Sequence, residues 1–153
     1  MPVSIQLLRD VLGLNQLAND AQADGHGMVS RLIREWQEGK NRFDRQGERI
    51  YSAFDAGRIC GVCGLNLDPF AGDATVGRVR RLYVAVASRR QGVGSAMMNR
   101  LMADAQNHFD ELHLRTYEAG AVAFYEALGF SIVQGDPHCT HRLLFGAIDH
   151  PDR

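Results

Sequence analysis

The sequence predicts a mixed α/β (α+β) fold, in which a mostly antiparallel sheet carries helices on both faces in the order βααβββαβαββ. Hydrophobic residues repeat with a helical period before Glu48 and alternate with polar residues after it. A glycine-rich junction then leads from a strand into another helix. A strand, helix, strand unit placed after an antiparallel meander adds a parallel pair to the sheet and a helix to its face.

Length and composition indicate one globular domain over residues 1–153. The chain has 153 residues, of which 45% are hydrophobic and 23% are charged, as in ordinary globular proteins. The net charge is -1 and the basic residues are scattered, which argues against a nucleic-acid partner. The longest apolar run, Leu82 to Ala87, is far too short to span a membrane, so we expect a cytoplasmic protein without a membrane partner.

The first third of the chain predicts one strand and two helices. The strand extends from Val3 to Arg9, and the first helix from about Leu12 to Ala23. Gly39 ends the second helix. The apolar face of this second helix is spaced at i, i+3, i+4 and i+7 and consists of Val29, Leu32, Ile33 and Trp36.

The middle of the chain predicts an antiparallel meander. Two alternating runs, Arg49 to Asp55 and Arg58 to Leu67, flank Asp55-Ala56-Gly57, which has the composition of a hairpin turn. A proline and glycine-containing loop follows, and Thr75 to Val86 predicts the third strand of the meander.

The last third of the chain predicts two helices and three strands. A helix extends from Ser95 to about His108, and a strand from Glu111 to Thr116 follows it. A second helix, from about Ala119 to Leu128, ends at a glycine. The final strands are Ser131 to Gln134 and Thr140 to Phe145.

The cysteines indicate buried thiols rather than a metal site. The chain has three of them, Cys60, Cys63 and Cys139, and an odd number favours a reducing compartment over a disulfide framework. Cys60 and Cys63 lie in a predicted strand, where residues three apart point to opposite faces and cannot chelate one ion together. We therefore expect no metal.

The segment from Leu82 to Ser95 predicts an anion-binding junction, because a strand turns through Gly92 and Gly94 directly into a helix. The first amides of a helix have no internal partner, and glycine lets a phosphate approach them. Arg89 and Arg90 add positive charge at the same place. The alternative is an ordinary strand-to-helix turn with two solvated arginines.

Two common phosphate motifs do not fit this junction. A P-loop requires Gly-Lys-Ser/Thr, and neither the lysine nor the hydroxyl is in register. A dinucleotide-binding loop requires a third glycine where Met97 stands, and it opens a parallel sheet instead of following a meander. An NTPase and an NAD-dependent enzyme are therefore disfavoured.

The segment Arg89-x-x-Gly92-x-Gly94 resembles the acetyl-CoA pyrophosphate loop of the GNAT N-acetyltransferases. A second segment, Ala121 to Phe130, resembles the other signature of that family, and the predicted order of elements matches the GNAT fold. The resemblance implies an enzyme that acetylates an amine of a small molecule or peptide with acetyl-CoA as cosubstrate, and it is compatible with a homodimer. It also implies that coenzyme A is held by Arg89, Arg90, Gln91, Gly92, Val93, Gly94 and Ser95, and by the backbone of Leu82, Tyr83 and Val84.

The same resemblance implies that Tyr125 is the general acid that protonates the leaving thiolate. Without the signature, Tyr125 is an amphipathic tyrosine at the margin of the core. Many members have an asparagine where this chain has Glu118, seven residues before Tyr125. No carboxylate stands on the signature strand between Gly77 and Arg81, so the general base stays open among Glu118, Asp73, His138, His141 and a water chain.

Arg78 and Arg80 alternate on one face of the signature strand. We interpret them as arginines of a solvent-facing edge with surface ion pairs. The alternative is that they reach the acceptor groove and favour an amine that bears a carboxylate.

Two other functions stay open at this point. One is a non-catalytic acyl-CoA-binding sensor or interaction module, which is compatible with Glu118 and with the missing strand carboxylate. The other, a zinc-binding module, rests only on the Cys60 and Cys63 spacing and on the histidines near Cys139.

Overall fold

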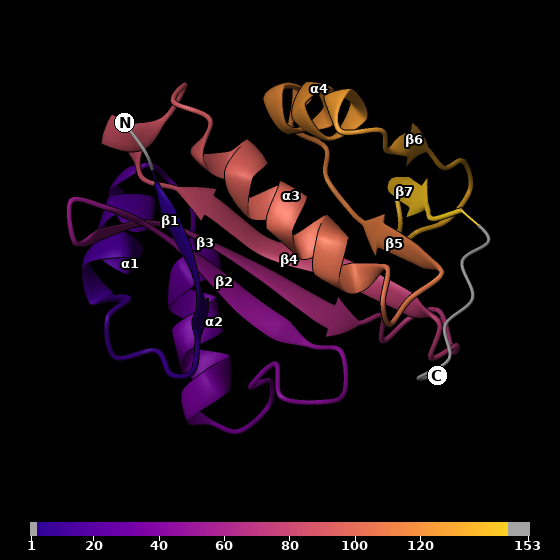
Figure 1. Ribbon diagram of the computed structural model, residues 1–153, viewed down its shortest axis with the longest axis horizontal. Coiled ribbons are helices and arrows are strands. Elements are labelled where there is room, and N and C mark those ends of the chain that lie inside the picture. Colours follow the sequence, from indigo (N-terminus) through magenta and orange to yellow (C-terminus); the bar gives the residue numbers. More distant parts are fainter. Residues whose placement is uncertain (1–2, 147–153) are drawn as a thin grey trace.

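The protein is represented by a computed structural model, which describes residues 3–146 and confirms the predicted order of elements (Figure 1). The expectation of one domain over residues 1–153 extends partly outside the described residues. The strands are β1 (Ser4–Leu8), β2 (Arg49–Asp55), β3 (Arg58–Leu67), β4 (Val76–Val84), β5 (Glu111–Leu114), β6 (Ser131–Ile132) and β7 (His141–Leu144). The helices are α1 (Asn15–Ala23), α2 (Met28–Gln37), α3 (Val93–Ala105) and α4 (Ala119–Ala127), with a short 3₁₀ helix at Val86–Ser88.

One seven-stranded sheet organises the molecule, with the strand order β1-β2-β3-β4-β5-β7-β6. All neighbouring strands are antiparallel except β4 and β5, which are parallel. The strand, helix, strand unit β4-α3-β5 therefore joins an antiparallel meander to a terminal antiparallel group. The predicted mixed, mostly antiparallel sheet is confirmed.

Several predicted boundaries shift by one to three residues in the structure. The predicted strand from Thr75 to Val86 ends at Val84, because Val86–Ser88 winds into the 3₁₀ helix. The predicted helix from Ser95 begins two residues earlier, at Val93, because Gly92 adopts a left-handed conformation with φ of 77° and starts the turn. These shifts place Gly92 and Gly94 at the helix start, where glycine lets a phosphate approach the backbone amides.

Helices cover both faces of the sheet and define two buried clusters. On one face, α3 contributes Met97, Met98 and Leu101 to a core shared with β2, β3, β4 and β5. On the other face, α1 and α2 pack on the sheet through residues such as Leu17 and Leu32. Figure 1 shows α3 crossing the sheet, with α1 and α2 lying beyond the meander strands. β4 is the middle strand of the sheet and contributes side chains to the buried clusters on both faces.

The cysteines are buried and free, but one expectation about them is wrong. Cys60 and Cys63 belong to the same buried cluster and not to opposite faces. The reason is a bulge in β3, which lies between the paired positions of Ile59 and Gly61 and shifts the alternation at Cys60. In residues 3–146 no group of three His, Cys, Asp or Glu side chains is arranged to hold a metal ion.

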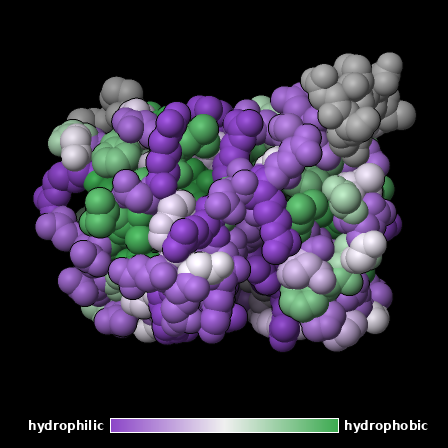
Figure 2. Space-filling view, turned by 90° about the horizontal axis from the view of Figure 1, so that it is seen from below, coloured by the Kyte–Doolittle hydropathy of each residue, from purple (hydrophilic) through white to green (hydrophobic). Residues whose placement is uncertain are grey.

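The face seen in Figure 2 is dominated by polar side chains, and apolar side chains appear mainly in the recesses between them. This distribution is what a helix layer that buries one apolar stripe against a sheet leaves at the surface. Within residues 3–146, no helix is both long and apolar enough to cross a membrane.

Candidate active site

The neighbouring strands β4 and β5 separate after a short stretch of parallel pairing. The pairing runs from Val76 with Glu111 to Arg78 with His113 and stops there. Beyond this point β4 continues beside β3 alone, while β5 is paired with β7. The two strands diverge, and a pocket of about 750 Å³ lies between them.

A β-bulge in β4 lies beyond the last position that is paired with β5. A single residue of β3 lies opposite both Arg81 and Leu82, between the paired positions of Arg80 and Tyr83. Arg81 has a φ of 59°, a left-handed conformation that is unfavourable for a residue with a side chain. Such a bulge bends the strand and redirects the backbone beyond it, in the part of β4 that lines the pocket.

An ion pair with α2 holds the bulge in place. The Nη2 of Arg81 donates to Oε1 of Glu35 at 2.9 Å, and Arg31 binds the other oxygen at 3.4 Å. Burial alone raises the pKa of Glu35, but the hydrogen bond and charge of Arg81, together with Arg31, hold that pKa below its usual value. The carboxylate is therefore charged at neutral pH and fixes the strained residue from outside the sheet.

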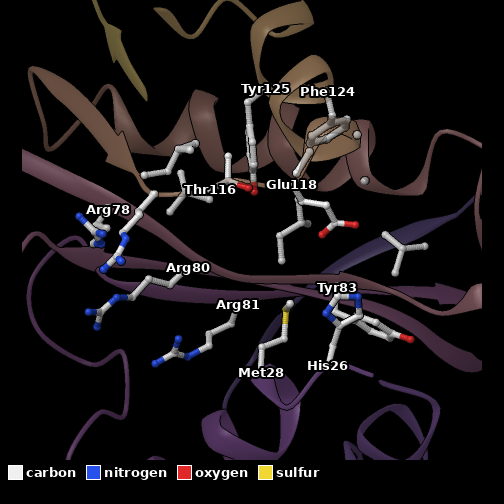
Figure 3. Close-up of a pocket in the computed structure, with 18 of the residues that line it drawn as sticks. His26, Met28, Arg78, Arg80, Arg81, Tyr83, Thr116, Glu118, Phe124 and Tyr125 are labelled. Carbon is white, nitrogen blue, oxygen red and sulfur yellow. The ribbon is translucent and has the colours of Figure 1, made fainter. Parts of the chain in front are cut away.

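The pocket is enclosed by β4 on one side, by the end of β5 and α4 on the other, and by the α1-α2 loop at its mouth (Figure 3). Arginines dominate its polar lining, whereas Glu118 is the acidic side chain that lines it within residues 3–146. The labelled side chains that line it are His26, Met28, Arg78, Arg80, Arg81, Tyr83, Thr116, Glu118, Phe124 and Tyr125.

Tyr125 extends from α4 into this pocket. Its ring packs edge-on against Phe124 at 5.2 Å and against Phe130 at 5.6 Å between centroids. Figure 3 shows the hydroxyl directed between the strands near Thr116, and the hydroxyl has no hydrogen-bond partner within residues 3–146. Burial raises the pKa of Tyr125 well above its ordinary 10.0, so the phenol keeps its proton at neutral pH.

The start of α3 presents backbone amides without partners inside the helix. Ala96 is the first residue whose N–H donates within the helix, to the carbonyl of Gly92, and no side chain caps the start. Gly92 and Arg90 both have positive φ, at 77° and 62°, which folds the loop into a concave turn. A second pocket of about 240 Å³ lies against this turn, so an anion can reach the amides.

The two pockets form one groove. Both are lined by Val84, Arg89, Gly94 and Phe124. A Cβ on Gly94 would lie 3.4 Å from Cζ of Phe124, so the helix start and α4 approach each other closely where the pockets join. The groove thus leads from the anion-binding turn to the hydroxyl of Tyr125.

The two arginine side chains of this turn, Arg89 and Arg90, differ in their contacts. The guanidinium of Arg89 binds Asp24 of the α1-α2 loop at 2.6 Å and the carbonyl of Val84 at 3.1 Å. Its Cζ lies 5.4 Å from the ring centroid of Tyr83. Arg89 is therefore committed to protein contacts, and the exposed Arg90 is the arginine of this turn without such contacts within residues 3–146.

The end of β4 exposes its backbone to the groove. The N–H of Ala85 donates to β3, and because successive amides of a strand alternate in direction, the N–H of Val84 points away from β3. The side chain of Tyr83 lines the pocket and donates its hydroxyl hydrogen to Asp20 of α1 at 2.5 Å. Of the predicted site residues of this strand, Val84 thus has a main-chain N–H directed away from β3.

Among the four candidate bases, the structure brings Glu118 to the pocket. Asp73 accepts hydrogen bonds from Thr75 in an exposed turn, and His141 is buried with its Nε2 3.7 Å from Glu126. His138 stacks on Phe70, whose ring lines the pocket, but it does not line the pocket itself.

His26 is a site residue that sequence reasoning missed. It lies between two glycines in the loop that joins α1 to α2, lines the pocket, and has its Nε2 3.6 Å from Asp24. Figure 3 places it across the pocket from Glu118. The only signal in the sequence is its position between two predicted helices near the expected acceptor region.

The interpretation of Arg78 and Arg80 as residues of a solvent-facing edge is wrong. β4 is a central strand, and Arg78 is buried, with its Nη2 donating to the carbonyl of His138 at 2.7 Å and its Nη1 3.6 Å from Asp68. Arg80 is partly buried and lines the pocket. The sequence could not reveal that the later β5 would cover this side of the strand.

Comparison with known families agrees with this geometry. The model of the Acetyltransferase (GNAT) family matches residues 13–130, which include the junction at α3 and the segment around Tyr125. Comparison with curated proteins gives no match.

Solved structures resemble most of the chain. A proposed acetyltransferase from Exiguobacterium sp. 255-15 has 30% identity and a TM-score of 0.82, with 94% of each chain covered. An acetyltransferase of the GNAT family from Streptococcus pneumoniae has 15% identity and a TM-score of 0.70, with 95% of this chain and 100% of that chain covered. A ribosomal-protein-alanine N-acetyltransferase from Brucella melitensis has 19% identity and a TM-score of 0.66, with 92% and 96% covered, and shares the fold.

Proposed function

Since this chain belongs to the GNAT acetyltransferase family, we propose that it transfers the acetyl group of acetyl-CoA to a primary amine of a small molecule or peptide. The observation that carries the proposal is the continuous groove from the unpaired amides of α3 to the unbonded hydroxyl of Tyr125. A diphosphate fits the first end, and an acid beside a leaving sulfur fits the second.

Coenzyme A would bind with its diphosphate on the turn at Gly92 and on the first amides of α3. Its pantetheine arm would follow the groove, where the N–H of Val84 and neighbouring main-chain groups of β4 can hydrogen-bond to it. Arg90 adds charge to the turn, whereas Arg89 contributes its backbone, because its side chain is held by Asp24. Glu118, in the place of the usual family asparagine, would border the arm as an acceptor.

The transfer itself requires a neutral amine, hydrogen-bond donors for the developing oxyanion and a proton for the thiolate. The amine nitrogen attacks the thioester carbonyl carbon, the carbon–sulfur bond breaks, and the sulfur takes the hydroxyl proton of Tyr125. The three cysteines are buried and do not line the pocket, which supports direct attack without an acyl-enzyme. The phenolate then recovers a proton from solvent.

The amine must lose a proton, and the groups best placed to accept it are His26 and Glu118. Both line the pocket, on opposite sides of the space beside Tyr125 (Figure 3). We assign the base role to His26, because it lines the pocket and histidine is the common base near neutral pH. Glu118 is nearer α4 and the expected pantetheine path.

Substitution of Tyr125 tests the proposal. Tyr125→Phe should lower turnover by about 10²- to 10⁴-fold, the usual contribution of a general acid, measured as free thiol released from acetyl-CoA. Since the hydroxyl makes no protein hydrogen bond within residues 3–146, the free energy of unfolding and the affinity for coenzyme A should change little.

Tyr117→Phe is the matched control, because Tyr117 is 71% exposed and lies outside the pocket lining. It should retain wild-type turnover. Unchanged turnover in Tyr125→Phe contradicts the assigned acid. Thermal stabilisation by acetyl-CoA without thiol release across a broad amine panel favours a non-catalytic acyl-CoA sensor instead.

A further inference from the structure

Four guanidinium groups converge on the part of the pocket beside the β4 bulge. They belong to Arg31, Arg78, Arg80 and Arg81, all of which line the pocket. Two carboxylates offset them: Asp68 lies 3.6 Å from Arg78, and Glu35 binds both Arg31 and Arg81. Four positive charges thus face two negative ones in this region, and neither carboxylate contacts Arg80.

Arg80 is the unusual member of this group. Its guanidinium makes no hydrogen bond and no ion pair with any residue of the described part of the chain, although the side chain is partly buried. Burial, followed by the charges of Arg81 and Arg78, lowers the pKa of Arg80, and the charge of Glu35 offsets this effect only in part. A partly buried cation between two like charges is destabilising unless something else compensates it.

The neighbouring arginines also have hydrogen-bond donors without an acceptor in the described part of the chain. The Nη1 of Arg78 and the Nε of Arg81 are buried without a hydrogen-bond partner in residues 3–146. The Nη1 of Arg78 is 3.6 Å from Asp68, beyond hydrogen-bonding distance, while Nη2 of the same side chain is used by a carbonyl. Unsatisfied buried donors beside an unpaired guanidinium are the expected features of an empty anion site.

We propose that this arginine cluster, defined as Arg31, Arg78, Arg80 and Arg81, binds a carboxylate of the acetyl acceptor, so that the acceptor is an amino acid or a similar amine with a carboxylate group. This inference rests on the proposed function and names its substrate class. The guanidinium of Arg80 binds the carboxylate through two parallel N–H donors, a geometry that arginine forms readily. The amine of the same molecule extends along the pocket toward Tyr125.

The charge of the pocket also selects against other amines. A polyamine would bring additional positive charge beside four guanidinium groups, whereas a carboxylate balances the excess. A simple alkylamine would leave Arg80 uncompensated when water is excluded. The bound carboxylate therefore contributes both attraction and the selection of one acceptor class.

The test measures binding of reaction products, because it then needs no turnover. N-acetylated α-, β- and ω-amino acids, each paired with its carboxamide, are titrated into the protein with coenzyme A present, and N-acetylspermidine serves as the cationic probe. We expect at least one N-acetyl acid to bind about 10- to 100-fold more tightly than its amide, the effect of one or two charge-assisted hydrogen bonds.

Arg80→Gln should abolish that preference for the acid, and Arg80→Lys should retain part of it. In the absence of ligand, Arg80→Gln should raise the melting temperature, because it removes an unpaired charge between two others; a merely structural arginine would lower it. Arg58→Gln, at the exposed start of β3, is the control and should retain the full preference.

Equal binding of acids and amides, preferred binding of N-acetylspermidine, or an acid preference that survives in Arg80→Gln would each overturn the inference. Loss of turnover with every amine, accompanied by an intact acid preference, would count against the proposed function alone. The two failures are therefore distinguishable.

Discussion

Arg81 combines a left-handed backbone, an ion pair to α2 and a place in the pocket lining. A residue with a side chain adopts this conformation at a cost of roughly 1–2 kcal/mol, so other contacts must hold it. Glu35 supplies that contact at 2.9 Å. Glu35 does not touch the groove, and we therefore regard it as a positioning residue for the β4 bulge.

Glu35→Gln should destabilise the protein by about 1–3 kcal/mol at pH 7, because it weakens the hydrogen bonds of a partly buried arginine. Since the pKa of Glu35 is lowered from 4.5, its contribution is fully present above that pH and is lost as the pH falls through the lowered value. The difference in free energy of unfolding between variant and wild type should therefore shrink at low pH.

Urea denaturation at pH 7 and under acid conditions measures this effect. Glu38→Gln near the end of the same helix is the control, because its pair with Lys40 is exposed and should contribute less than about 1 kcal/mol. Equal losses for both variants, or a difference that does not depend on pH, would count against the role of Glu35.

Sequence patterns predicted individual site residues unequally. Tyr125 and Gly92 stand in short local signatures, which is why their placement could be predicted. His26 and Glu35 reach the site only through the packing of α1 and α2 on the sheet, and no local spacing records that packing. Arg78 was misinterpreted for the same reason, since its burial depends on Asp68 and on strands that follow later in the chain.

Among the helices and strands, the start of α3 is the one on which the proposed binding of coenzyme A most depends. Gly94 is its second residue, and it lines both pockets where α3 approaches α4. A side chain there would extend toward Phe124 and into the proposed path of the pantetheine arm. The glycine therefore matters for the space that it leaves open.

Gly94→Val should weaken coenzyme A binding by at least about ten-fold, equivalent to about 1.4 kcal/mol, measured by calorimetric titration. Thermal stability should not fall, because glycine is itself a poor helix residue. Gly13→Ala is the control, since a Cβ at Gly13 meets no atom within 4 Å and Gly13 is outside the groove. Wild-type affinity of Gly94→Val for coenzyme A would contradict binding of the pantetheine arm in this groove.

All of the predicted elements are present, because each has a local periodicity or a turn that marks it. Their ends were less predictable, as the early end of β4 before the 3₁₀ helix at Val86–Ser88 illustrates. The bulge at Arg81 could not be predicted, because it depends on register with β3 and on an ion pair from another helix. The bulged residues Arg81 and Leu82 line the pocket, so this part of the site could not be predicted either.

At the scale of the whole molecule, the buried thiol of Cys63 links stability to alkaline pH. It lies in the core under α3, with its Sγ 3.8 Å from the sulfur of Met98, and complete burial raises its pKa from 9.0 to about 12. Because folding raises this pKa, the buried neutral thiol stabilises the protein fully below pH 9.0 and progressively less above it.

The free energy of unfolding should therefore fall by about 1.4 kcal/mol per pH unit for this thiol above its unfolded pKa. Cys63→Ala should have a shallower decline, measured by urea denaturation with a reductant between pH 8 and pH 10, before tyrosines contribute strongly. Parallel declines in wild type and variant would contradict this assignment of the core thiol.

Cytoplasmic location and homodimer formation stay predictions.

The proposed function requires that this molecule move an acetyl group from coenzyme A to an amine where β4 and β5 diverge. The most direct measurement is mass spectrometry of amines incubated with acetyl-CoA and wild-type protein, with free thiol quantified in the same samples. The account predicts one acetylated amine for each coenzyme A released. An intact thioester with every amine, or thiol release without an acetylated product, would contradict it.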